Sequence, residues 1–235
     1  GGAGTSGPYS QSLRGDIYEA FLDKLRQTGY TYPCFCTRAD IMATQAPHQS
    51  DGRVVYAGTC RPSSFPSGCV PQRPHATRIY VPDEEIVYSD VVFGPQSVNL
   101  ARECGDFILR RADGAWAYQL AVVVDDALMG VRQVVRGADL LLSAAQQIYL
   151  YRMLGLEPPS FAHLPLVCNA EGRRLSKRDA ALGMAELRAA NSPEELLGRI
   201  AAMAGLIPEA RAISLGELLS EFSWSKIHRL PTLKA

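Results

Sequence analysis

The sequence predicts an α/β fold organised around a parallel sheet, and three observations indicate this class. Strand-like and helical segments alternate over residues 118–167, as they do in proteins with parallel sheets. The 235 residues, 47% apolar and 20% charged, have an ordinary globular composition, which excludes a disordered or fibrous chain. No apolar run approaches the roughly 20 residues of a membrane helix. The 24 basic and 24 acidic residues balance, which excludes nucleic-acid coating by bulk charge.

The first predicted helix spans residues 13–28. Ile17, Phe21 and Leu25 recur at helical spacing, and Gly29 is a suitable stop. Strand-like runs follow at 78–81, 85–88, 96–100 and 107–110, and Asp113 with Gly114 predicts a tight turn. The first half of the chain therefore combines one helix with several short strands.

Two β-rich runs, at 118–126 and 133–139, end in polar residues. Ligands collect at the carboxyl ends of strands in open α/β sheets, so Arg136 could hold a carboxylate or a phosphate there. We expect Ser143 to cap a helix that ends before Gly155, and a short strand near residues 163–167.

The last third of the chain is predicted to be helical. Ser192 with Glu195, and Ser214 with Glu217, form two capping-box patterns, and Gly205 should end the first of these helices. Four of the eleven residues at 169–179 are basic. Such a loop could stabilise the charge of a departing pyrophosphate, or it could simply be solvated.

The cysteine pattern suggests a metal site. Cys34 and Cys36 stand on one short segment and Cys60 follows; three thiolates are most of what a tetrahedral Zn²⁺ requires. The alternative is three small core residues. Cys104 and Cys168 have no neighbouring ligands and are predicted to be core residues. The candidates for the fourth ligand are Tyr56, His48, Cys69 and His75.

Residues 53–82 contain four arginines and no acidic residue. This stretch could face phosphate groups or could be a solvated loop, and the pattern favours neither. The arginines are Arg53, Arg61, Arg73 and Arg78.

Three motifs, in this order, resemble class I aminoacyl-tRNA synthetases of the glutamyl type. They are Val123-Val124-Asp125-Asp126 shortly before Val135-Arg136-Gly137-Ala138-Asp139, then His163-Leu164-Pro165-Leu166, then Arg174-Leu175-Ser176-Lys177-Arg178, which is similar to the KMSKS-type signature. Ala138-Asp139-Leu140 replaces the Glu-Asp-His usual in discriminating glutamyl enzymes. In this it resembles the glutamyl-queuosine tRNA(Asp) synthetases, a short paralogous family without an anticodon-binding domain.

The resemblance implies roles for individual residues. Tyr118 and Arg136 would bind glutamate, and Lys177 would contact ATP and act in catalysis together with Ser176 and Arg174 of the signature loop. One structural Zn²⁺ would be bound by a C-x-C…Y-x₃-C set, with Mg²⁺ expected beside the substrate ATP. That metal set is Cys34, Cys36, Tyr56 and Cys60.

The resemblance also implies a domain organisation. Residues 1–32 and 117–172 would form a split Rossmann-type catalytic domain, residues 33–116 a zinc-bearing acceptor-binding-like insertion, and residues 173–235 the signature loop and a helical stem-contact region. The family's HIGH signature and first Rossmann strand have no counterpart here. We therefore expect the catalytic domain to be N-terminally incomplete and this chain to lack part of the active site.

The implied reaction is ATP-dependent activation of glutamate and its transfer to the queuosine of tRNA(Asp). The implied partners are glutamate, ATP and the anticodon stem-loop of tRNA(Asp), with no membrane, and the protein is expected to be a cytoplasmic monomer. Two alternatives stay open. One is the catalytic fragment of a discriminating glutamyl-tRNA synthetase, and the other is a non-catalytic zinc-bearing RNA-binding module.

Overall fold

The structure is a computed structural model that describes residues 10–43, 55–63, 73–169 and 184–234. The chain divides into two compact units, and each is built from several sequence segments. The first unit comprises Gly1–Tyr88, Pro95–Gln133 and Leu142–Pro159, and the second comprises Ser89–Gly94, Val134–Leu141 and Ser160–Ala235. None of the helices in the described ranges is long and apolar enough to cross a membrane.

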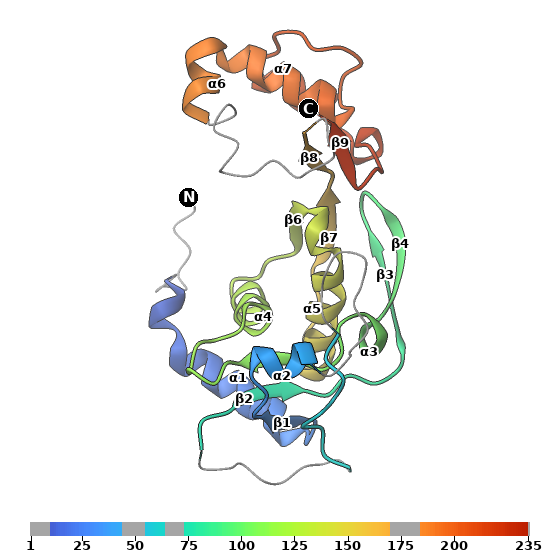
Figure 1. The fold of residues 1–235 in the computed structure, drawn as a ribbon. Helices are drawn as coiled ribbons and strands as arrows, with labels where there is room; N and C mark the ends of the chain where they lie inside the picture. Colours follow the sequence, from blue (N-terminus) through green and yellow to red (C-terminus); the bar gives the residue numbers. More distant parts are fainter. Residues whose placement is uncertain (1–9, 44–54, 64–72, 170–183, 235) are drawn as a thin grey trace. The chain divides into compact units, whose positions relative to one another are not determined.

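The first unit contains most of the helices and strands predicted for the first two thirds of the chain (Figure 1). Its helical elements are η1 (Gln11–Leu13), α1 (Gly15–Gln27), α2 (Arg38–Ala43), α3 (Leu100–Glu103), α4 (Tyr118–Leu128) and nearly all of α5 (Leu141–Met153). Its strands are β1 (Thr31–Cys34), β2 (Ala76–Ile79), β5 (Phe107–Arg110) and most of β3 (Glu85–Asp90) and β4 (Gly94–Asn99). The predicted first helix and the four strand-like runs are confirmed.

A three-stranded antiparallel sheet, in the order β1-β2-β5, organises the lower part of this unit in Figure 1. All four residues of the central strand β2 are buried. Its pairing with β1 sets Cys34 opposite Ala76. The sheet therefore fixes the position of the first predicted metal ligand.

Residues 118–126 form a helix, so the prediction of a β-rich run there is wrong. Helix α4 buries Leu120, Val123 and Val124 almost completely and packs against α1. A short apolar run is compatible with either a buried strand or a buried helix, and packing decides between them. Here Asp125, one turn after Ala121, is anchored by three side chains from residues 11–18.

That anchor is a buried carboxylate that joins α4 to the start of the chain. Asp125 accepts hydrogen bonds from Arg14 Nε at 2.8 Å, from Gln11 Nε2 at 2.9 Å and from the Tyr18 hydroxyl at 2.9 and 3.0 Å. A buried charge requires this degree of compensation, because an unpaired one costs several kcal/mol. The Val-Val-Asp-Asp motif thus contributes a structural carboxylate at its third position.

The second unit contains the end of β3, the first residue of β4, the remaining strands and the C-terminal helices. Its elements include β6 (Gln133–Gly137), η2 (Ala138–Leu140), β7 (Ser160–Leu164), β8 (Leu166–Cys168), α6 (Met184–Ala190), α7 (Pro193–Ala204), α8 (Leu215–Glu221), η4 (Trp224–Lys226) and β9 (Thr232–Lys234). A four-stranded sheet has the order β4-β3-β7-β6. Strand β3 pairs in parallel with β7 through Asp90 and Phe161, and β8 pairs in parallel with β9.

The α/β class is confirmed. The predicted parallel pairing is found between β3 and β7 and between β8 and β9, whereas β1, β2 and β5 pair in antiparallel fashion. Ser143 is also not an N-cap. Helix α5 begins at Leu141, directly after η2, so Ser143 lies within its first turn. Because α5 continues directly from the 3₁₀ turn η2, it begins at Leu141, before the position that Ser143 would cap.

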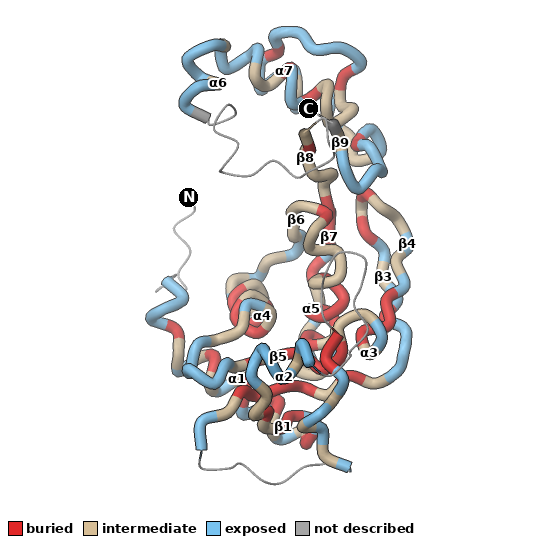
Figure 2. The backbone as a smooth tube through the Cα atoms, viewed as in Figure 1, coloured by how far each residue is buried: buried red, intermediate tan, exposed pale blue. Residues whose placement is uncertain are grey.

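The C-terminal helices follow their sequence signals closely. Ser192 with Glu195 and Ser214 with Glu217 each form a complete capping box, and Gly205 ends α7 in the left-handed conformation. The backbone of Arg211 packs so closely on Gly198 of α7 that a Cβ atom there would lie 1.6 Å from the Arg211 carbonyl oxygen. Figure 2 shows α6 largely exposed, in contrast to the buried residues of α4.

Candidate functional site

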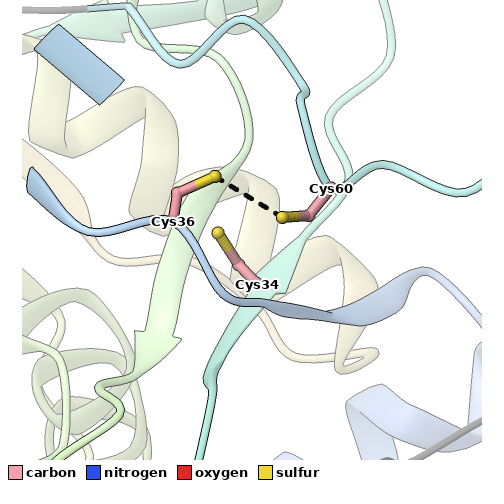
Figure 3. A group of neighbouring side chains, drawn as sticks. All are labelled: Cys34, Cys36 and Cys60. Atoms are coloured by element: carbon pink, nitrogen blue, oxygen red, sulfur yellow. Dashed lines mark hydrogen bonds between the residues drawn. The ribbon is translucent and has the colours of Figure 1, made fainter. Parts of the chain in front are cut away.

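Three cysteines converge in the first unit, as their spacing suggested. The sulfur atoms of Cys34, Cys36 and Cys60 all lie within 4.8 Å of one another. The Sγ atoms of Cys36 and Cys60 are 3.5 Å apart, and Figure 3 shows the three side chains pointing toward one another. Cys34 ends β1, Cys36 follows on the same segment, and Cys60 comes from a separate loop.

The Tyr56 hydroxyl lies beside the same sulfur atoms. It is 3.5 Å from Cys34 Sγ and 4.0 Å from Cys36 Sγ, and it accepts a hydrogen bond from the Cys60 backbone N–H at 2.8 Å. A tetrahedral zinc with bonds of about 2.3 Å to sulfur and about 2.0 Å to oxygen requires S···S separations of about 3.8 Å and O···S separations of about 3.5 Å. The 3.5 Å separation of the Cys36 and Cys60 sulfur atoms and the 3.5 Å separation of the Tyr56 hydroxyl from Cys34 Sγ are close to these values, so the three cysteines together with Tyr56 could hold a metal ion.

The other candidates for a fourth ligand are less well placed. His75 does not belong to the cysteine cluster, and its Nδ1 lies 2.8 Å from the Arg73 carbonyl oxygen. His48 and Cys69 lie outside the described residues. Tyr56 is therefore the remaining candidate within the part of the chain that the structure describes.

Backbone and ring contacts hold Tyr56 in this position. Its backbone N–H donates to the Cys104 carbonyl at 3.2 Å. Tyr56 also forms an isolated parallel β-bridge with Gly105, whose φ is +66°. A Cβ atom at Gly105 would lie 2.3 Å from the Tyr56 carbonyl oxygen, so no larger residue fits there without a shift. The Arg78 guanidinium covers the ring face at 3.7 Å from its centroid.

Protonation in the cluster reflects burial and the mutual influence of its members. Burial, together with the neighbouring thiols of Cys60 and Cys34, raises the pKa of Cys36 to about 11. Burial also raises the pKa of the Tyr56 hydroxyl. For Cys60 burial acts in the same direction, but the Phe35 N–H and the neighbouring side chains donate hydrogen bonds and bring its pKa below the ordinary value. A bound divalent cation would favour the deprotonated form of every one of these groups.

Two of the four arginines in the basic stretch have internal partners, which contradicts a phosphate-facing role for them. Arg61 pairs with the fully buried Asp106 through Nε at 2.7 Å and Nη2 at 2.9 Å. Arg78 is buried and donates to the Asp106 carbonyl at 2.6 Å. Arg73 is exposed, and Arg53 lies outside the described residues.

Asp106 links the segments around the cysteine cluster, a role that no motif or spacing in the sequence indicates. Besides Arg61, its carboxylate accepts hydrogen bonds from the Tyr32 hydroxyl and from the Val81 N–H at 2.9 Å. Tyr32 precedes Cys34 by two residues, and Arg61 directly follows Cys60. The carboxylate therefore connects both segments that supply cysteines.

In the second unit, Arg136 lies at the end of β6, as predicted. Its Nε donates to His163 Nε2 at 3.0 Å and its Nη2 donates to the Leu140 carbonyl at 3.2 Å. The guanidinium also lies over the Phe161 ring, 5.1 Å from its centroid. The half-buried side chain is thus held by several contacts within its own unit.

His163 is in turn held by a buried carboxylate. Its Nδ1 lies 2.6 Å from Asp90 Oδ2, and both side chains are inaccessible to solvent. Asp90 also accepts hydrogen bonds from the backbone N–H groups of Val92, Phe93 and His163. Burial opposes ionisation of Asp90, but these hydrogen bonds outweigh it and bring its pKa below the ordinary value.

The other predicted site residues are placed separately or lie outside the described chain. Tyr118 begins α4 in the first unit and is 52% exposed, whereas Arg136 belongs to the second unit. Arg174, Ser176 and Lys177 lie outside the described residues. Their roles therefore stay predictions.

Comparison with known proteins agrees with the motifs. The family of class I tRNA synthetases for E and Q, catalytic domain, matches residues 2–226. A Glutamyl-Q tRNA(Asp) synthetase of Symbiobacterium thermophilum is 44% identical over 235 residues, which cover 97% of this chain and 72% of that protein. The protein of the same name from Geobacter sulfurreducens is 51% identical over 176 residues, which cover 74% of this chain and 55% of that protein.

Two solved structures share the fold. The glutamate-tRNA synthetase of Elizabethkingia anophelis superposes with a TM-score of 0.77 at 27% identity, covering 97% of this chain and 52% of that one. The glutamate tRNA ligase of Elizabethkingia meningosepticum, solved in complex with its amino acid, gives a TM-score of 0.77 at 28% identity and covers 98% of this chain and 52% of that one. This chain thus spans about half of each solved protein. It belongs to the class I glutamyl- and glutaminyl-tRNA synthetase family.

Proposed function

We propose that the protein containing this chain is a ligase that activates glutamate with ATP and transfers it to the queuosine of tRNA(Asp). The observation that supports this most strongly is the 44% identity with a Glutamyl-Q tRNA(Asp) synthetase over 97% of the chain. The solved relatives point to the same amino acid, since they are glutamate-tRNA synthetases.

Arg136 is proposed to bind glutamate. A guanidinium can form two parallel hydrogen bonds with a carboxylate, which selects both charge and geometry. Tyr118 is the second proposed glutamate contact. In the activation step, an oxygen of the glutamate α-carboxylate bonds to the α-phosphorus of ATP while the bond to the β-phosphate breaks, which gives glutamyl-AMP and pyrophosphate. Mg²⁺ bound with the ATP would help to neutralise the phosphate charge. Lys177, with Ser176 and Arg174, is proposed to stabilise the charge that develops on the phosphates.

Cys34, Cys36, Tyr56 and Cys60 are proposed to bind one structural Zn²⁺. The S···S and O···S separations in the site support this assignment. Arg78 on the Tyr56 ring and the Asp106–Arg61 pair next to Cys60 hold the segments that carry these ligands. When bound, the ion would connect β1 to the loop at residue 60, so its contribution is to the local fold.

The tRNA is proposed to bind through its anticodon stem-loop, with phosphate contacts that position the RNA and a splayed-out queuosine that supplies the base choice. Because Arg61 and Arg78 have internal partners, the candidate phosphate contacts narrow to Arg73, Arg53 and the basic loop near residue 174. The protein is proposed to act as a cytoplasmic monomer.

The decisive experiment uses the complete gene product and labelled glutamate. One pool of tRNA(Asp) contains queuosine, and the matched pool comes from cells unable to make it. We expect incorporation only into the first pool and none into tRNA(Glu). Charging of tRNA(Glu) at its 3′ end would instead establish the glutamyl-tRNA synthetase alternative, the activity for which the solved relatives are named.

Activation is tested separately by pyrophosphate exchange into ATP in the absence of tRNA. We expect exchange that depends on glutamate. Arg136→Ala should raise the glutamate KM, because it leaves a substrate carboxylate unpaired. Lys177→Ala should mainly lower kcat, because its contact strengthens as charge develops. Absence of exchange together with zinc-dependent RNA binding would favour the non-catalytic alternative.

A further inference from the structure

In the second unit, a series of buried hydrogen bonds supports the Arg136 side chain. It is formed by Asp90 and His163, to which no substrate contact is assigned. Asp90, His163 and Arg136 form a continuous hydrogen-bonded series from three separate strands: the end of β3, β7 and β6. The first two side chains are fully buried and the third is half-buried. The series therefore runs from the protein interior to one guanidinium.

The hydrogen-bond partners determine the protonation of His163. Asp90 accepts four other hydrogen-bond contacts from backbone N–H groups and its pKa lies below the ordinary value, so it faces the ring as a carboxylate and Nδ1 must donate. At the opposite side of the ring, Arg136 Nε–H points at Nε2 from 3.0 Å. Two N–H groups cannot face each other at that distance, so Nε2 has to be the acceptor. His163 is therefore the neutral Nδ1–H tautomer.

We propose that Asp90 and His163 are positioning residues that hold the Arg136 guanidinium in one orientation for the carboxylate of glutamate. The proposal rests on the proposed function, in which Arg136 binds glutamate. Asp90 fixes the tautomer and the ring orientation of His163, and the ring then fixes the Nε edge of Arg136. The Leu140 carbonyl holds Nη2 and the Phe161 ring covers one face of the guanidinium.

The benefit of this arrangement is pre-organisation. An arginine side chain has several rotatable bonds, and immobilising such a side chain on binding opposes affinity. A guanidinium already held in its bound orientation avoids that loss. A neutral imidazole accepts the Nε–H without removing the positive charge.

Two substitutions at residue 163 separate the two functions of the ring. His163→Asn can retain a donor at the position of Nδ1 and removes the acceptor at Nε2. His163→Gln can retain an acceptor near Nε2 and removes the donor to Asp90. If the ring serves only the fold, the variant that loses the buried Asp90 contact should be worse in every assay.

The first measurement is glutamate binding by calorimetry, with denaturant unfolding as the parallel control. We expect His163→Asn to weaken glutamate binding roughly two- to tenfold, the range for one newly mobile side chain. His163→Gln, which keeps an acceptor near Arg136 but loses the contact that orients it, should retain more of the glutamate affinity than His163→Asn does, and it should unfold at lower denaturant because Asp90 loses its ring partner. Equal glutamate affinity of His163→Asn and wild type would overturn the proposal. Loss of affinity that simply follows loss of stability in both variants would also overturn it.

The second measurement does not depend on glutamate. In ¹⁵N-labelled protein, a scalar coupling across the hydrogen bond should join Arg136 Nε to His163 Nε2, with His163 protonated at Nδ1 only. The coupling should disappear in His163→Asn. A proton on His163 Nε2 at neutral pH would overturn the inference. If the coupling is present but the wild type binds no glutamate, the proposed function fails and the positioning role fails with it. If the wild type binds glutamate and both variants bind it equally well, the positioning role alone is refuted.

Discussion

Replacing Asp106 by Asn should destabilise the first unit more than any exposed ion-pair substitution. The carboxylate is fully buried and accepts four hydrogen bonds: two from Arg61, one from the Val81 N–H and one from the Tyr32 hydroxyl. An amide oxygen has two lone pairs, and the new NH₂ group would face donors. At least two of the four donors therefore lose their partner in Asp106→Asn.

The expected cost is about 3 kcal/mol. Hydrogen bonds to a charged group contribute about 1.5–3 kcal/mol each, and removing one member of a buried pair costs about 3–5 kcal/mol. The lower end applies because the Arg61 side chain is 35% exposed, so water can take up part of its lost interaction. For a chain of this size, about 3 kcal/mol corresponds to a fall in Tm of roughly 6–12 °C.

The assay is equilibrium unfolding in urea, followed by far-UV circular dichroism, with Asp83→Asn as the matched control. Asp83 pairs with Arg102, and both side chains are largely exposed, so this change should cost less than about 1 kcal/mol. Chelator competition on the zinc-loaded protein gives a second reading, because Tyr32 and Arg61 adjoin cysteine ligands. We expect faster zinc release from Asp106→Asn only. Equal unfolding midpoints for the two variants would refute the assigned importance of Asp106.

Three further predictions concern stability and metal content. Asp90→Asn should destabilise the protein most near neutral pH. Because the pKa of Asp90 is depressed in the folded state, the difference in unfolding free energy between variant and wild type should shrink as the pH falls below about 4. Urea unfolding at several pH values measures this difference. Gly198→Ala should lower the unfolding free energy by about 1–3 kcal/mol, because the new Cβ would overlap the Arg211 carbonyl oxygen. The control is Gly216→Ala, whose Cβ would meet nothing within 4 Å; it should be neutral or stabilising by up to about 1 kcal/mol in the same assay. Elemental analysis should find about one Zn²⁺ per chain in the wild type and in Cys104→Ser, and almost none in Cys36→Ser; metal-free wild-type protein prepared without chelator would contradict the zinc assignment.

Local signals in the sequence predicted local structure well. The first helix, the strands around residues 76–110 and both capping boxes are confirmed, because propensity, apolar spacing and cap chemistry all act within a few residues. Helix α4 shows where this fails. Its apolar run is too short to distinguish a helix from a strand, and its contacts with α1 and with residues near the N-terminus decide the outcome.

Contacts between distant residues could not be predicted in the same way. Asp90 and His163 are 73 residues apart, and Asp106 is 45 residues from Arg61. The cysteine spacing predicted three converging thiols, but only family resemblance selected Tyr56 as the fourth ligand. The tight approach of Gly105 to Tyr56 is also a tertiary feature, which a single glycine in a loop does not reveal.

The division of the chain has a consequence for how this protein can be dissected. The second unit is assembled from residues 89–94, 134–141 and 160–235, so the polypeptide passes between the two units five times. No single cut releases either unit intact. A fragment that begins at residue 160 would contain His163 without Asp90 or Arg136, and a fragment that ends at residue 159 would contain those two residues without His163. Deletion series, proteolytic fragments and domain swaps at linear boundaries would therefore each break the Arg136 arrangement, and point substitutions are the appropriate means of analysing it.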